Sequence, residues 1–310
     1  MSAPTLSARL EDYLTLRRAM GFKMERHEKL LGQFVDYLTG HGCGTVTVDH
    51  ALAWATSPTG ADPRWWAARL SMARGFAAYL HTLDPAHQVP PAKMISHGGR
   101  RVIPHLYTDE EVLGLLDAAA RLPGRPMRSE TYRVLIGLLF TTGMRVGEAI
   151  SVDRRDFDAR AGVLIVHEGK FTKSRLLPLH PTTTAVLERY LDQCDRLVPQ
   201  PQTTALLLST NGCRLRYERV WTTFHRLLDD AGLVLPPPAS SPRIHDMRHS
   251  FAVRTLLDWY RDGADVPAML PRLSTYLGHS DPKHTYWYLS AAPELLALAA
   301  ERLQTSKERS

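Results

Sequence analysis

The sequence predicts a mainly α-helical protein of two domains, all-helical in the first and mixed α+β in the second, where the β-structure is a small hairpin. Three observations predict this: long stretches with helical apolar spacing, a break rich in proline and glycine, and two short apolar strands joined by a polar turn. A chain of 310 residues is long for one core and comfortable for two. We expect domains over residues 1–84 and 106–310, with a linker over residues 85–105.

Composition and charge indicate a globular protein with a polyanionic partner. Apolar residues make up 44% and charged residues 23% of the chain, which excludes a disordered or fibrous protein. The net charge of +6 and the isoelectric point near 9.3 favour a nucleic acid, although an ordinary basic surface is about as common. The sequence has neither a secretory signal at its start nor an apolar run of membrane-spanning length, so we expect a cytoplasmic protein without a membrane partner.

The first 84 residues show the helical pattern most clearly. Apolar side chains recur at helical spacing over residues 5–20, 31–38 and 64–80, with a weaker signal over residues 48–54. Basic residues interleave with these stripes, and we interpret some of them as contacts for a nucleic-acid backbone, a solvated face being the simpler alternative. The candidates are Lys23, Arg26, Arg69 and Arg74.

The second domain begins with a clear helix start. Thr108 followed three residues later by Glu111 gives a capping box ahead of an apolar run. Residues 132–140 are apolar nearly all round, which is typical of a buried central helix. Helical spacing returns after Pro181, so helices dominate this domain as well.

One stretch of the second domain predicts β-structure. Residues 163–166 and 175–179 are short apolar strands, and the polar segment between them predicts a hairpin tip that carries Lys170 and Lys173. A lysine on a movable hairpin is a reasonable general acid, although a plain solvated turn is the simpler interpretation. We also expect Lys173 and Arg175 to contact nucleic acid.

The segment TTGMRVGE, residues 141–148, places Arg145 between a glycine turn and the start of a new helix. An arginine beside a helix N-terminus suits a phosphate, because its planar fork adds to the local N–H donors. Glu148 lies one turn further on and is placed to brace the guanidinium. The alternative is an ordinary arginine–glutamate pair on a surface helix.

The segment HDMRH, residues 245–249, places His245 and Arg248 on one helix face, with His249 four residues from the first histidine. An imidazole beside a fixed guanidinium suits proton handling at an anion. The H-x-x-x-H spacing is also that of a zinc hydrolase, with Asp246 in the place of the base. The arginine between the two histidines disfavours a divalent cation, so we consider zinc the weaker interpretation.

The segment LGHS, residues 277–280, precedes a tyrosine. Gly278 permits a tight turn that presents His279, and Tyr288 follows nine residues later. A phenol in line with a phosphate that two guanidiniums hold can attack it without a metal ion. Tyr286 is the rival nucleophile, and the two tyrosines point to different sides of a helix. For either of them, simple packing in the core is the alternative.

In order and spacing, these motifs resemble the tyrosine recombinase or phage integrase family, including its two-domain Xer type. The resemblance covers residues 106–296 and rests on several separate motifs. It implies that Arg145, His245 and Arg248 bind and activate the scissile phosphate. Glu148 matches the acidic residue that supports the first of these arginines.

The same resemblance implies the remaining chemistry. Lys170 protonates the leaving 5′ oxygen, His279 donates to a phosphate oxygen, and Tyr288 forms a 3′-phosphotyrosyl bond. No cofactor, metal or ATP is implied, and the reaction is site-specific recombination of an integrase or transposase type. Residues 293–303 predict a C-terminal helix that docks on a neighbouring protomer or on its own domain.

The resemblance also implies partners and a role for the first domain. That domain is similar to the core-binding domain of the family, and the partner is a double-stranded DNA recombination site. A homo-tetramer assembles on this DNA, with or without other recombinases. A type IB topoisomerase and a non-catalytic DNA-binding protein are the alternatives, and the complete residue set argues against the second.

Overall fold

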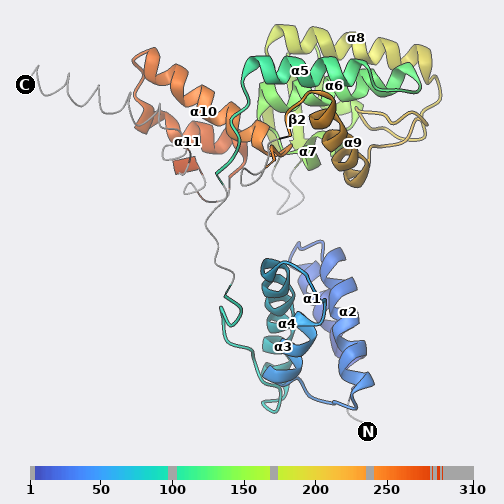
Figure 1. Cartoon of the computed structure of the whole chain (residues 1–310), viewed down its shortest axis with the longest axis vertical. Coiled ribbons are helices and arrows are strands. Elements are labelled where there is room, and N and C mark those ends of the chain that lie inside the picture. The colour runs from blue at the N-terminus through green and yellow to red at the C-terminus, as the bar shows by residue number, and fades with distance from the viewer. Residues whose placement is uncertain are drawn as a thin grey trace, which may run out of the picture. The chain divides into compact units, whose positions relative to one another are not determined.

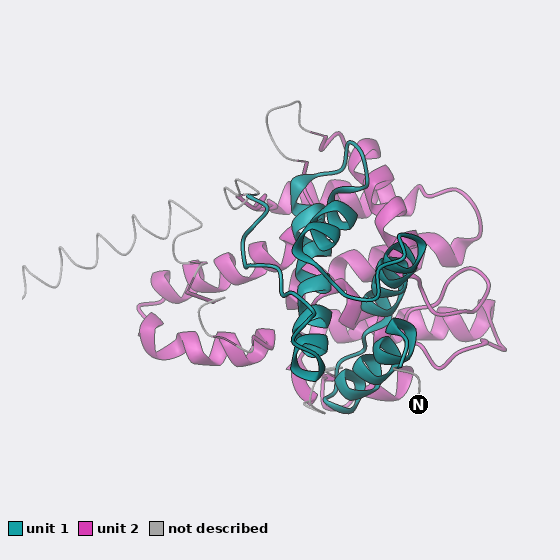
Figure 2. Cartoon of the chain, turned by 90° about the horizontal axis from the view of Figure 1, so that it is seen from below, with its two compact units in different colours: residues 1–101, 169–171 teal, residues 102–168, 172–310 magenta. Residues whose placement is uncertain are grey.

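The computed structural model describes residues 4–96, 103–167, 174–234, 241–279, 281, 285, 286 and 288. These residues form two compact units, unit 1 up to residue 96 and unit 2 from residue 103. Figure 1 shows the elements and Figure 2 distinguishes the two units. Within the described ranges, the helices are too short or too polar to cross a membrane.

Unit 1 is a bundle whose described helices are α1 (Leu6–Ala19), α2 (Glu25–Gly40), α3 (Val48–Thr56) and α4 (Pro63–Leu83). The side chains of Thr5 and Thr47 cap α1 and α3 by accepting hydrogen bonds from backbone N–H groups in the first turn. Apolar residues of all four helices meet in one core, where Phe34 and Phe76 are fully buried.

The helices of unit 2 surround a buried central helix. The described elements are α5 (Asp109–Ala120), α6 (Pro126–Thr142), α7 (Val146–Ser151), the short 3₁₀ helix η1 (Arg154–Asp156), α8 (Pro181–Leu197), α9 (Tyr217–Asp230), α10 (Asp246–Arg261) and α11 (Val266–Leu277). The central helix is α6, which contacts α5, α7, α8 and α10. Its apolar residues are buried almost all round, as the sequence predicts. The capping box of Thr108 and Glu111 is also present at the start of α5.

The described strands of unit 2 form an antiparallel sheet in the order β1–β2–β3. The strands are β1 (Phe157–Asp158), β2 (Val163–His167) and β3 (Ser174–Pro178). The β2–β3 pair is the predicted hairpin, and its register places buried Leu164 opposite buried Leu177. Strand β1 was not expected, because two residues are too few to show an alternating pattern.

A smaller core joins α10, α11 and Tyr288. Its buried members include Leu256 and Leu273, and Phe251 packs beside them. This core holds the segment around Gly278 against the start of α10. The ends of α6, α10 and α11 therefore meet in one region of unit 2.

Candidate active site

The turn after α6 has no space for a side chain. Gly143 ends the helix at φ +62°, in the left-handed region that glycine tolerates best. A Cβ atom there would lie 2.4 Å from Cδ1 of Phe251. The Gly143 carbonyl accepts a hydrogen bond of 2.9 Å from Nη1 of Arg248. The glycine thus lets α10 approach and gives the second predicted arginine a backbone acceptor.

Arg145 follows this turn and is held by Glu148. Its backbone N–H donates to Oε2 at 2.8 Å and its Nη1 donates to Oε1 at 2.7 Å. Its Nη2 donates to the carbonyl of Gly278 at 3.1 Å. The Arg145 side chain remains 40% exposed, whereas that of Glu148 is 11% exposed. The guanidinium is therefore fixed in orientation and still open to a ligand.

A second arginine shares the same carboxylate. Arg175 of β3 donates to both oxygens of Glu148, with the shorter bond at 2.8 Å, and its Nε donates to the carbonyl of Tyr276 at 2.9 Å. Burial raises the pKa of Glu148, but hydrogen bonds from Arg175 and Arg145 outweigh burial and lower it overall. The Arg175 side chain is 10% exposed, so it lies inside unit 2 and not on the surface expected of a nucleic-acid contact.

Arg248 is buried, with 2% exposure. Besides the bond to Gly143, its Nη2 donates to the carbonyl of Leu277 at 2.5 Å. Burial, followed by the positive charge of Arg145, lowers the pKa of Arg248 to about 10. Backbone carbonyls thus orient this guanidinium, and both predicted arginines are tied to the turn at residues 277 and 278.

The two histidines of the HDMRH segment lie at the start of α10. The ring centroids of His245 and His249 are 5.1 Å apart and the rings are perpendicular. Burial and the charge of His245 lower the pKa of His249 to about 4, so this ring is neutral near pH 7. Asp246 is buried and pairs with Arg243 at 2.7 Å, which occupies the carboxylate that a zinc hydrolase would use as its base. In the described part of the chain, His, Cys, Asp and Glu side chains form no group of three or more that suits a metal.

The predicted nucleophile, Tyr288, lies beside His249 of the HDMRH segment and His279 of the LGHS segment. The Tyr288 ring is 5.4 Å from the ring of His249 and 6.1 Å from that of His279. Nδ1 of His279 lies 2.7 Å from Oγ1 of Thr285. Tyr288 is 2% exposed and Tyr286 is 53% exposed, so the two tyrosines do point to different sides.

The structure therefore brings together most of the predicted catalytic residues and the glutamate that supports them. They are Arg145, Glu148, His245, Arg248, His279 and Tyr288. Lys170 and Lys173 lie outside the described residues, as does the predicted helix over residues 293–303.

The predicted basic contacts in unit 1 differ in exposure. Lys23 and Arg26 are exposed, and the Arg26 guanidinium lies 4.7 Å from the centroid of a Trp65 ring. Arg74 is half-buried. Arg69 is buried, because its Nη2 donates to the carbonyl of Trp54 at 2.7 Å and its guanidinium lies over that indole. Arg69 thus stabilises unit 1 from within and does not present its charge to solvent.

Sequence reasoning missed three features around the site. These are the hydrogen bonds from Arg175 to Glu148, the contact between Thr285 and His279, and the packing of the His249 ring beside Tyr288. A usable signal existed for Arg175: residues two apart on a strand share a face, and Leu177 is buried. Thr285 and His249 depend on tertiary packing that no local pattern reports.

Comparisons with known proteins agree with this arrangement. Residues 106–294 match the phage integrase family. The chain is 39% identical over 305 residues to a putative integrase/recombinase, y4rB, of Sinorhizobium fredii, with 97% of each chain covered.

Two solved structures share the fold at low sequence identity. One is the integrase of the transposon Tn1549 in complex with a circular intermediate DNA, with a TM-score of 0.67 and 16% identity over 97% of this chain and 100% of that one. The other is a lambda integrase tetramer bound to a Holliday junction, with a TM-score of 0.59 and 18% identity over 93% of this chain and 78% of that one.

Proposed function

Because the chain belongs to the phage integrase family, whose members cleave and rejoin DNA strands, we propose that it is a site-specific DNA recombinase that acts through a 3′-phosphotyrosyl intermediate. One observation carries the proposal. Arg145, Arg248 and Tyr288 come from separate parts of the sequence and meet around the turn at residues 277–279.

The two arginines bind the scissile phosphate. Each guanidinium is oriented before substrate arrives, Arg145 by Glu148 and Arg248 by backbone carbonyls. Donors that are fixed in advance stabilise the charge that grows on the phosphate oxygens without a reorganisation cost, and one such donor typically contributes about 3–4 kcal/mol. His245 and His279 add hydrogen-bond donors to the same oxygens.

Tyr288 is the nucleophile. Its phenol oxygen forms the bond to phosphorus as the bond to the 5′ oxygen breaks, and its proton passes to a neighbouring base. The His249 ring is close and neutral near pH 7, so it can accept a hydrogen bond from the phenol, but with a pKa of about 4 it is too weak a base to keep the proton, which passes on to solvent water. Lys170, which lies between β2 and β3 in the sequence, gives the proton to the leaving 5′ oxygen.

The covalent intermediate conserves the energy of the phosphodiester bond. A second 5′-hydroxyl can therefore displace Tyr288 and rejoin the strand without ATP or a metal ion. Unit 1 serves as the core-binding domain and exposes Lys23 and Arg26 for the DNA backbone. Exchange between two duplexes needs four protomers, and the lambda integrase tetramer on a Holliday junction supports such an assembly.

The test uses a nicked duplex that releases a short strand after cleavage and so traps the covalent adduct. We expect wild-type protein and Tyr286→Phe to give an SDS-stable adduct and Tyr288→Phe to give none. The pair is matched, because each variant loses one phenol oxygen and Tyr286 is exposed. An adduct from Tyr288→Phe would show that another residue attacks the phosphate. No adduct from the wild type, on DNA recovered with the protein from cells, would contradict the recombinase proposal.

A further inference from the structure

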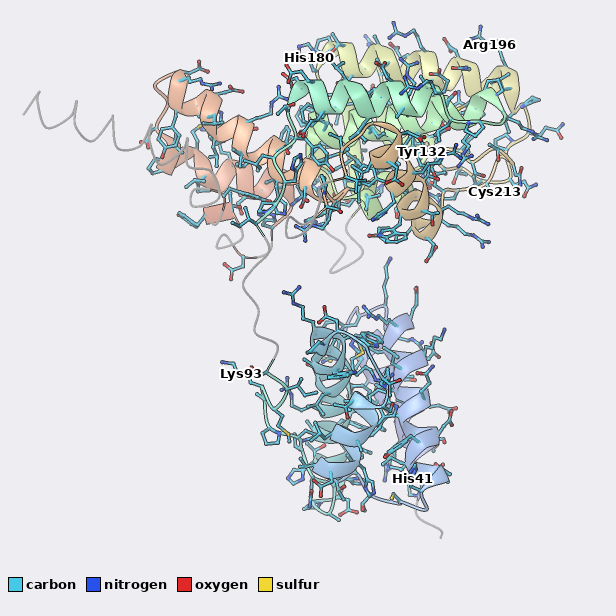
Figure 3. All side chains as sticks on the ribbon, viewed as in Figure 1. His41, Lys93, Tyr132, His180, Arg196 and Cys213 are labelled. Atoms are coloured by element: carbon cyan, nitrogen blue, oxygen red, sulfur yellow. The ribbon has the colours of Figure 1, made fainter. Side chains whose placement is uncertain are left out.

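A second group of arginines lies at the opposite end of α6 from Gly143. They line a cavity of about 670 Å³ formed by the N-terminal ends of α6 and α9 and the connection before α9. Tyr132 and Cys213, labelled in Figure 3, line the same cavity. The arginines are Arg125, Arg128, Arg214, Arg216 and Arg219.

In the part of the chain that the structure describes, most of these arginines have no carboxylate to neutralise them. Among the described residues, Arg214 alone of the five pairs with an acid, Asp153. Arg125 donates to the carbonyl of Thr210 at 3.2 Å, and Arg128 donates to the carbonyl of Pro123 at 3.3 Å. Within the described ranges, the cavity lining includes neither aspartate nor glutamate. The cavity is therefore strongly positive.

The helix ends add to this charge. Arg125 and Arg216 are the N-cap residues of α6 and α9, and Arg128 and Arg219 follow three positions later. Neither described N-terminus has a side-chain cap, and the partial positive charge of each helix is directed toward the arginines. Helix α5 shows the usual pattern, a threonine cap followed by three acidic residues, whereas the first turn of α6 has no acidic residue and that of α9 has one, Glu218. Cations at these positions are unfavourable unless an anion joins them.

We propose that this cavity binds backbone phosphates of the DNA arm beside the cleavage site. The inference rests on the proposed recombinase function and extends the protein–DNA interface beyond the active site. One phosphate is satisfied by one or two arginines, so the four arginines at the two helix ends, Arg125, Arg128, Arg216 and Arg219, fit a run of phosphates.

The length of α6 sets where these phosphates lie. The helix has 17 residues, and at a rise of 1.5 Å per residue it is roughly 25 Å long. For a duplex that runs along α6, with a 3.4 Å rise, a phosphate in the cavity is separated from the one at Arg145 by about seven base pairs. The cavity contacts the arm and not the scissile step.

The test compares Arg216→Gln/Arg219→Gln with the charge-matched variant Arg189→Gln/Arg196→Gln. The control arginines are exposed on α8, which lies on the other side of α5 from α9 in Figure 1, and Arg196 is labelled in Figure 3. Affinity for duplex DNA is measured over a range of salt. Loss of two phosphate contacts should reduce the slope of log affinity against log salt by about 1.8 and weaken binding roughly 10- to 100-fold at low salt.

Further measurements separate the outcomes. The cavity variant should keep or raise its melting temperature, because two cations leave a helix N-terminus, and should form adduct at the wild-type rate on saturating DNA. Arms truncated to fewer than about seven base pairs should remove the difference between the variant and the wild type. Equal salt slopes for the two double variants, with adduct still formed, would overturn the cavity proposal and leave the recombinase proposal intact. Saturable binding of pyrophosphate with an unchanged DNA salt slope would also overturn it, in favour of a small-anion site.

Discussion

The two ends of α6 both gather arginines, but they hold them differently. At the Gly143 end, Arg145 is fixed by the carboxylate of Glu148, and Arg248 is fixed by two backbone carbonyls. At the Pro126 end, Arg125 and Arg216 are exposed, and in the described part of the chain carboxylates do not pair with them. Fixed guanidiniums suit a transition state, whose geometry is defined within tenths of an ångström. Exposed guanidiniums without a carboxylate partner suit a flexible DNA backbone that approaches from solution.

The strongest way to break this comparison is to loosen a fixed arginine. Arg248→Lys keeps the charge but loses the fork that reaches Gly143 and Leu277, so we expect the cleavage rate on saturating DNA to fall about 10²- to 10³-fold. Arg254→Lys on the same helix, at an exposed ion pair, should change the rate less than about threefold. Both variants should unfold cooperatively in a thermal scan. A near wild-type rate for Arg248→Lys would mean that charge alone is sufficient.

The second prediction concerns Gly143, at the C-terminal end of α6, where there is no space for a side chain. Gly143→Ala forces a side chain into the left-handed region and against Phe251, so we expect it to lower the free energy of unfolding by about 2–4 kcal/mol. Gly232→Ala is the control: φ is +68° and its Cβ meets no described atom within 4 Å, so it should cost only about 1 kcal/mol. Urea unfolding measures both values. Equal losses would show that Phe251 moves aside without cost.

The smallest expected effect tests the carboxylate of Glu148, which Arg145 and Arg175 share. Arg175→Gln leaves Glu148 with one arginine, so the cleavage rate should fall roughly 10-fold while DNA affinity stays near the wild-type value. The pKa of Glu148 is lowered in the folded protein. As pH falls through that pKa the carboxylate is protonated, and its ion pair with Arg145 is lost. Removing Arg175 raises this pKa, so activity should begin to fall at a higher pH than in the wild type.

Exposed Arg160→Gln is the control for this variant and should alter neither the rate nor its pH profile. A loss of DNA affinity with an unchanged rate would instead make Arg175 a nucleic-acid contact, as its sequence position suggested.

The fold class was predictable because periodicity reports burial directly. The nearly all-apolar stretch at residues 132–140 lies within the central helix α6. The two short apolar strands that precede and follow Lys170 in the sequence pair as the hairpin β2–β3. Helix starts with a capping residue, such as Thr108, were predictable for the same local reason. Strand β1 was not, since it exists only through its pairing with β2.

The sequence could predict which residues belong to the candidate site, but not which partners they contact. Spacing within TTGMRVGE places Glu148 beside Arg145, because both lie on one helical turn. Arg69 and Arg175 look like surface charges in the sequence, yet both lie inside the protein. The Arg69 guanidinium packs over the indole of Trp54, and that of Arg175 bonds to the carboxylate of Glu148. Long basic side chains take their direction from such partners, which the local sequence does not contain.

The carbonyl acceptors of the two arginines have a consequence for synthesis of the chain. Arg145 is bound to a carbonyl 133 positions later in the sequence, and Arg248 to carbonyls 105 positions before it and 29 after it. A ribosome releases these segments in order, so a partly made chain holds Arg145 long before it holds the turn that orients it. Contacts of such long range form late in folding. The enzyme is therefore incapable of cutting DNA until the turn at residues 277 and 278 has been made and packed.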